Sequence, residues 1–178
     1  MQDQDTSQFE PAGMSDYFRK AFQIIRLDQS AMLEVAQDRN ALRFGIPVTA
    51  IGGALAFLPG EDLTALLVGA LFSLVVLVFL AAFVHLLCGY TKSKQEFLGF
   101  VRIIAVAGIL DWAVVIPYTG VFITVWSVAI AIAAAREVYY LTRAKAIFTV
   151  LISVIMLWMM TLIIFTGPLS SYLVKIAE

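Results

Sequence analysis

The chain has 178 residues, of which 61% are hydrophobic and only 14% are charged. Soluble domains carry about 45–50% apolar and about 25% charged residues, so this composition indicates a membrane protein and excludes an ordinary soluble enzyme. The net charge of −1 argues against a nucleic-acid partner, and a single cysteine, Cys88, excludes an internal disulfide and a cysteine metal site.

Residues 1–14 are expected to form a disordered polar tail. The first ten of them include Asp3, Asp5 and Glu10 but no Lys or Arg. A secretory signal peptide needs a basic start followed by an apolar run, and neither is present here. Insertion is therefore expected to depend on the membrane spans themselves.

Residues 15–43 are predicted to form one or two amphipathic helices on the cytosolic side of the membrane. Ser15 is a predicted N-cap, and Asp16 follows it near the positive end of the helix dipole. A second helix is expected to begin at Asp28 or Ser30.

The first of these helices has a basic face and an apolar face. Phe18, Phe22 and Ile25 recur at i, i+4 and i+7, whereas the rest of the surface carries Arg19, Lys20, Gln23 and Arg26. This pattern is typical of a helix that lies in the membrane surface, with its basic residues toward anionic lipid headgroups. A helix docked on the protein's own cytosolic face would show the same pattern.

The rest of the chain predicts an all-α bundle of about five membrane spans over residues 44–168, followed by a short tail at 169–178. The expected spans are approximately 44–58, 63–87, 97–116, 121–140 and 146–166. About 20 residues are usual for a span, so the first is short. It contains Pro47, and it is either completed by Ala41 and Leu42 or re-entrant.

The basic residues predict the orientation of these spans. With an odd number of spans, one side collects nearly all of the Lys and Arg, and the other carries only Lys175 beside Glu61, Asp62 and Glu178. The positive-inside rule then places the N-terminus in the cytosol and the C-terminus outside. We expect an integral protein of a bacterial plasma membrane, with the bilayer and its anionic lipids as partners, and self-association or other membrane proteins as further options.

No catalytic motif is present, and His85 is the only histidine. We therefore expect no enzymatic activity, no cofactor and no metal.

Asp111 is the main candidate polar site, because it lies inside the third span, several residues before Pro117. A charged side chain at a helix centre costs roughly 2.5–3.5 kcal/mol on insertion scales. Asp111 is thus either a proton, cation or substrate site, or a structural carboxyl near the outer interface, the level that Trp112 suggests.

A second candidate site is a polar cluster near the cytosolic ends of the spans. Such a cluster would bind a lipid phosphate or a loop of a partner, although snorkelling side chains explain it more simply. Its predicted members share one depth: His85, Arg102, Arg136, Glu137, Thr142 and Lys145.

Small residues spaced four apart indicate close helix packing. The pairs are Gly52 and Ala56, Gly69 and Ser73, Ala129 and Ala133, and Ala131 and Ala135.

The stretch from His85 to Ile152 resembles the Yip1 family of five-span membrane proteins. The resemblance rests on the loop from His85 to Phe97, the helix start from Phe100 to Ala107, Ile116-Pro117 with Gly120, Trp126-Ser127, and Arg136-Glu137 followed by Thr142, Lys145 and Ala146. Tyr90 replaces the second glycine of the family's loop, and Asp111 stands near a position where the family often has proline.

Eukaryotic members bind prenylated Rab GTPases and help to shape or traffic Golgi and endoplasmic-reticulum membranes. This short chain resembles prokaryotic members, for which the resemblance implies a fold rather than an activity. The first functional hypothesis is a non-enzymatic protein that organises lipid or partner proteins. The alternative is a small transporter or permease subunit that uses Asp111, and a water-filled path to Asp111 would favour it.

Overall fold

The computed structural model describes residues 13–58, 63–88 and 94–166, and these ranges are helical apart from short connections. The predicted polar tail before residue 13, the turn at 59–62, most of the loop after the second span and the tail from 167 onward lie outside the described residues. In chain order the elements are α1 (Met14–Ile25), α2 (Gln29–Gln37), α3 (Ala41–Ala56), α4 (Leu63–Leu87), α5 (Lys94–Ala107), the 3-10 helix η2 (Gly108–Val115), α6 (Gly120–Tyr139) and α7 (Arg143–Thr166).

Four stretches are long and apolar enough to cross a membrane, which confirms the predicted all-α architecture of membrane helices. They are Leu63–Leu87, Glu96–Val115, Gly120–Tyr139 and Arg143–Ile163. The shorter apolar helix α3 covers most of the predicted first span, and whether it crosses the bilayer stays a prediction.

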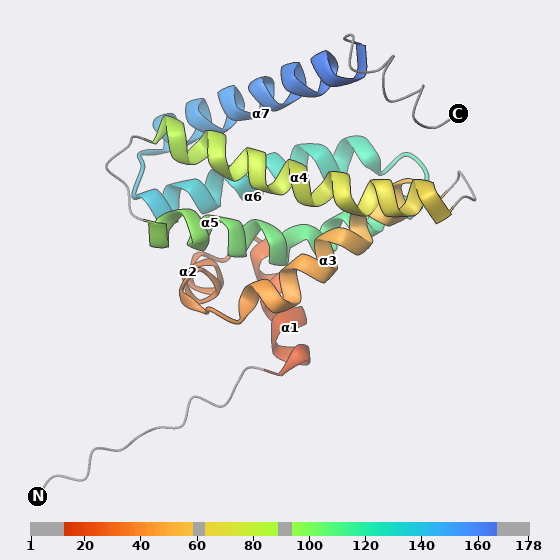
Figure 1. Ribbon diagram of the computed structural model, residues 1–178. Coiled ribbons are helices and arrows are strands. Elements are labelled where there is room, and N and C mark those ends of the chain that lie inside the picture. The colour runs from red at the N-terminus through yellow and green to blue at the C-terminus, as the bar shows by residue number, and fades with distance from the viewer. Residues whose placement is uncertain (1–12, 59–62, 89–93, 167–178) are drawn as a thin grey trace, which may run out of the picture.

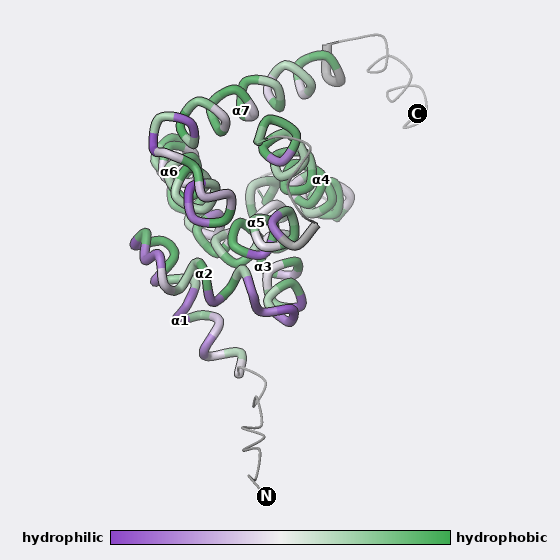
Figure 2. The backbone as a smooth tube through the Cα atoms, turned by 90° about the vertical axis from the view of Figure 1, so that its left-hand side faces the viewer, coloured by the Kyte–Doolittle hydropathy of each residue, from purple (hydrophilic) through white to green (hydrophobic). Residues whose placement is uncertain are grey.

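The elements form a layered bundle (Figure 1). Helices α4, α5 and α6 run along roughly one direction, α7 crosses one side of them at an angle, and α1 and α2 lie on the opposite side (Figures 1 and 2). Figure 2, which looks along the bundle, shows hydrophilic residues mainly in α1, α2 and the helix ends, and hydrophobic residues along the long helices. This distribution fits a bundle whose long sides face lipid.

The two N-terminal helices begin differently. The predicted N-cap Ser15 is wrong, since α1 begins at Met14 after Gly13 and no side chain caps it. The second helix, expected to begin at Asp28 or Ser30, begins at Gln29, with Asp28 as its N-cap. The Asp28 carboxylate accepts hydrogen bonds from the backbone N–H of Ser30 and Ala31 at 2.9 and 3.3 Å. These bonds, together with the Ser30 hydroxyl, lower the pKa of Asp28.

Helix α1 docks on the bundle through a face next to the one that carries Phe22. Tyr17, Ala21 and Ile24 are buried, whereas Phe22 is 58% exposed. The Trp126 indole N–H of α6 donates to the Ile25 carbonyl oxygen at 2.8 Å. The helix therefore packs on the protein, and lipid contact through its exposed side stays a prediction.

The basic residues of α1 divide between the protein and the solvent-facing side. Lys20 forms ion pairs with Asp16 at 3.2 Å and with Glu34 of α2 at 3.4 Å, and its side chain is only 14% exposed. Arg19 also pairs with Asp16 but remains largely exposed, and Arg26 is exposed as well. Arg19 and Arg26 are thus better placed than Lys20 to meet a lipid headgroup.

Replacement of Tyr17 by phenylalanine is expected to loosen α1. The buried Tyr17 hydroxyl donates to the Asp38 carboxylate at 2.5 Å, which joins α1 to the end of α2. Burial and this bond raise the pKa of Tyr17, so the phenol stays protonated and keeps donating at physiological pH. A hydrogen bond to a charged group contributes about 1.5–3 kcal/mol. Limited proteolysis of Tyr17→Phe should cut near α1 faster than in the wild type, and unchanged cleavage would contradict this contact.

Glycines allow α3 to approach both of its long neighbours. A Cβ on Gly45 would lie 2.7 Å from the Cβ of Ala105 in α5, and a Cβ on Gly53 would lie 2.4 Å from the carbonyl oxygen of Gly69 in α4. Such distances leave no room for a side chain. The predicted pair Gly69 and Ser73 is therefore at a close helix contact.

Candidate functional site

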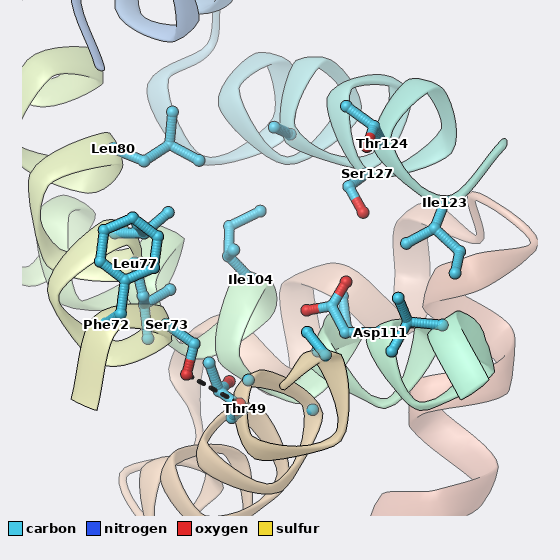
Figure 3. Close-up of a pocket in the computed structure, with 18 of the residues that line it drawn as sticks. Thr49, Phe72, Ser73, Leu77, Leu80, Ile104, Asp111, Ile123, Thr124 and Ser127 are labelled. Atoms are coloured by element: carbon cyan, nitrogen blue, oxygen red, sulfur yellow. Dashed lines mark hydrogen bonds between the residues drawn. The ribbon is translucent and has the colours of Figure 1, made fainter. Parts of the chain in front are cut away.

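A cavity of about 540 Å³ lies inside the bundle, and Asp111 is on its wall (Figure 3). The wall comes from five parts of the chain: α3, α4, the third span with α5 and η2, α6, and α7. Most of its residues are aliphatic, aromatic or glycine. The volume falls within the roughly 300–1,000 Å³ of small-molecule sites, which are also mostly apolar with few polar groups.

The third span changes its helical form just before Asp111. Helix α5 ends at Ala107, and the eight residues of η2 continue as a 3-10 helix. A 3-10 run of more than three or four residues is uncommon and often marks a functional segment. The side chain of Asp111 extends from η2 into the cavity (Figure 3).

Contacts with α3 hold η2 in place. The Thr49 hydroxyl donates to the Ala105 carbonyl oxygen at 3.1 Å, and the Trp112 indole N–H donates to the Val48 carbonyl oxygen at 2.9 Å. A Cβ on Gly52 would lie 2.9 Å from the Cβ of Asp111, so α3 packs directly against the base of that side chain. The position of Asp111 is therefore fixed by packing on one side and open to the cavity on the other.

The Asp111 carboxylate has no hydrogen bond or ion pair with any residue in the described part of the chain. Among the described residues, no Lys, Arg or His lines the cavity. A carboxylate away from bulk water and without a partner is costly. The site can lower this cost by accepting a proton, a cation or a hydrogen-bond donor from a guest.

The hydroxyl groups of the wall are mostly engaged. Ser73 donates to the carbonyl oxygens of Thr49 and Ala70, and Thr124 donates to that of Gly120. Ser127 of α6 forms no hydrogen bond with another described residue, and in Figure 3 its hydroxyl points into the cavity across from Asp111. Asp111 and Ser127, which face each other across the cavity, thus both offer free polar groups to a guest.

The predicted cytosolic cluster does not form one network. The His85 ring lies 3.2 Å (Nδ1 to hydroxyl oxygen) from Tyr139, Arg136 pairs with its neighbour Glu137 at 2.9 Å, and Arg102 donates to the Ala36 carbonyl oxygen of α2 at 2.6 Å. Thr142 and Lys145 are exposed. Local contacts satisfy most of these groups, which favours the structural explanation over a shared binding site.

Several residues of the cavity and of the predicted cytosolic cluster have no distinguishing sequence signal. Tyr139 is 1% exposed and joins α4 to α6 through His85, with Phe97 packed on the same histidine ring at 5.4 Å. Thr49 and Ser127 appear in the sequence as ordinary hydroxyl residues of apolar stretches. Their roles become visible only when the neighbouring helices are in place, because these helices determine which face of α3 and α6 lines the cavity.

Comparisons with protein-family models, with curated proteins and with solved structures find no match for this chain.

Proposed function

We propose that the protein is a non-enzymatic integral membrane protein that binds a small amphiphilic guest in the cavity beside Asp111. One observation carries this proposal: an unpaired carboxylate lies on the wall of a largely apolar cavity of about 540 Å³ within the bundle. Such a cavity accepts the apolar part of a guest, and the carboxylate selects its polar part. Binding of membrane-soluble molecules is one way in which the chain would organise membrane lipid.

The guest reaches such a site from the bilayer, because the long sides of the bundle are apolar. Leu67, Leu71 and Val75 of α4 and Val121 and Val125 of α6 are all exposed. Helix α7 contributes Leu157 and Trp158 to the cavity wall, and part of the Trp158 side chain is exposed. The helices that border the cavity therefore have apolar outer faces, and the wall at Trp158 is itself partly exposed.

A pair of phenylalanine substitutions on α6 tests this function. Ser127→Phe places a ring in the cavity, whereas Val125→Phe places the same ring on a residue that is 62% exposed. In phosphatidylcholine nanodiscs, native mass spectrometry with dodecanol as a neutral probe should show one saturable bound molecule for the wild type and for Val125→Phe. Ser127→Phe should lose it. Equal retention by all three proteins would refute the cavity as a binding site.

Transport of a proton or a small cation through Asp111 is the second candidate, and the same unpaired carboxylate favours it. It differs from simple binding because it requires access from both sides of the membrane. Flux of protons into proteoliposomes that exceeds the leak of empty liposomes, and that Asp111→Asn removes, would select transport.

We also propose that the protein is of the Yip1 type and lies in a bacterial plasma membrane with its N-terminus in the cytosol. The Lys and Arg distribution supports that orientation. The exposed Arg19, Phe22 and Arg26 of α1 support a further contact with anionic lipid headgroups.

A further inference from the structure

The described part of the cavity wall carries a single ionisable side chain, Asp111. No Lys, Arg or His from the described ranges lines the cavity to neutralise it. Among the described residues nothing donates a hydrogen bond to its carboxylate. Charge complementarity therefore favours a guest that brings a positive charge with N–H donors.

The hydroxyl across the cavity fits the same kind of guest. Ser127 points into the space that Asp111 faces, and its oxygen has lone pairs to accept an N–H donor (Figure 3). The Thr124 hydroxyl donates to the Gly120 carbonyl oxygen at 2.9 Å, which fixes its orientation, whereas the Ser127 hydroxyl has no hydrogen bond with another described residue. An ammonium group has three donors, so it can bind Asp111 and Ser127 at once.

The remaining wall suits an alkyl chain. Away from Asp111 the cavity wall includes Phe72, Leu77 and Leu80 of α4 (Figure 3). Helix α7 adds Val154 and Leu157 to the same wall. Since lipid hydrocarbon is as apolar as the cavity wall, the cavity holds an alkyl chain through close packing. A guest with one ammonium head and one alkyl chain would thus meet complementary surface over its whole length.

Going beyond the proposed function, on which this inference rests, we propose that the guest is a single-chain primary amine whose ammonium group binds Asp111 and Ser127. A fatty acid would bring a second carboxylate to Asp111. A diacyl phospholipid would bring its anionic phosphate, and the lining holds no basic residue to bind it. Like charges in a medium of low dielectric constant repel strongly, so both classes are disfavoured.

Native mass spectrometry in phosphatidylcholine nanodiscs tests this choice with three probes of equal chain length: dodecylamine, dodecanol and laurate. The wild type should bind dodecylamine roughly tenfold or more tightly than dodecanol, because a charged hydrogen bond replaces a neutral one. Laurate should bind weakest. Asp111→Asn should bind dodecylamine and dodecanol equally, and its retained dodecanol binding shows that it is folded. Glu137→Gln, which removes a carboxylate paired with Arg136, should keep the preference for the amine.

Three results would overturn the inference. Equal binding of dodecylamine and dodecanol to the wild type would remove the role of the charge, and an amine preference that survives in Asp111→Asn would assign it to another group. If an added ethanolamine phospholipid displaces dodecylamine, the preferred guest is a diacyl lipid and not a single-chain amine. In each case the proposed function would still be supported if dodecanol binds saturably to the wild type and Ser127→Phe abolishes that binding. Failure of the amine inference is therefore distinguishable from failure of the proposed function.

Discussion

The substitution Asp111→Asn is expected to abolish the protein's function in cells while the protein still accumulates in the membrane at the wild-type level. Asparagine keeps the size and most of the hydrogen-bonding capacity of aspartate but removes its charge. A charge at such depth costs roughly 2.5–3.5 kcal/mol on insertion scales, so its removal does not destabilise the bundle. Complementation of a deletion strain, with the protein amount measured by immunoblot, checks both parts of the expectation.

Two further variants separate the charge of Asp111 from its shape. Asp111→Leu removes the polar group altogether and should also insert normally without function. Glu137→Gln is the matched control, because this carboxylate is already paired with Arg136 at 2.9 Å and does not line the cavity. A wild-type phenotype from normally expressed Asp111→Asn would make the residue structural and would remove the transport alternative that depends on it.

The substitution Gly53→Ala is expected to cause the largest loss of stability. The added Cβ would lie 2.3 Å from the Ser73 hydroxyl oxygen and 2.4 Å from the Gly69 carbonyl oxygen, both on α4. The latter is backbone and cannot rotate away, so α3 and α4 must separate. Overpacking of this kind costs about 1–3 kcal/mol. Separation of the two helices would also disturb the hydrogen bond that the Ser73 hydroxyl donates to the Thr49 carbonyl oxygen.

A second glycine provides the control for this change. A Cβ on Gly120, at the start of α6, would have no atom within 4 Å, so Gly120→Ala should unfold at the wild-type temperature or slightly above it. Thermal unfolding in a mild detergent, followed by circular dichroism, compares the two variants. The same unfolding temperature for both would show that α3 and α4 do not approach as closely as described.

Hydropathy was sufficient to predict the long helices. The predicted span 63–87 coincides with α4, and the later spans differ from α6 and α7 by only a few residues, since a lipid-facing helix must be apolar on all sides. The same uniformity hides which face packs inward. The docking of α1 through Tyr17 rather than through Phe22 follows from contacts with distant residues such as Phe44, at 5.4 Å between ring centroids, and these leave no local signal.

The candidate site was predictable only in part. Asp111 stood out because a carboxylate is rare within an apolar run, and that argument needs no neighbour. The sequence suggests an interfacial level for Trp112 but gives no packing partner. In the structure its indole N–H donates a hydrogen bond to the Val48 carbonyl oxygen, and its ring centroid lies 6.4 Å from that of Phe18. The 3-10 form of η2 and the cavity depend on how α3, α4, α6 and α7 are rotated about their axes, which their near-uniform hydrophobicity does not specify.

Thiol labelling of two positions on α6 tests most directly whether Asp111 faces an accessible cavity inside the bundle. With the native thiol removed by Cys88→Ala, Ser127→Cys and Val125→Cys are compared in liposomes for their reaction with N-ethylmaleimide. Position 127 lines the cavity opposite Asp111, whereas position 125 is on the exposed, apolar side of the same helix. A thiol reacts as the thiolate, which water inside a cavity permits and lipid hydrocarbon suppresses. Faster labelling at 127 than at 125, slowed by dodecylamine, is the predicted result, and labelling at 125 that equals or exceeds labelling at 127 would contradict the account.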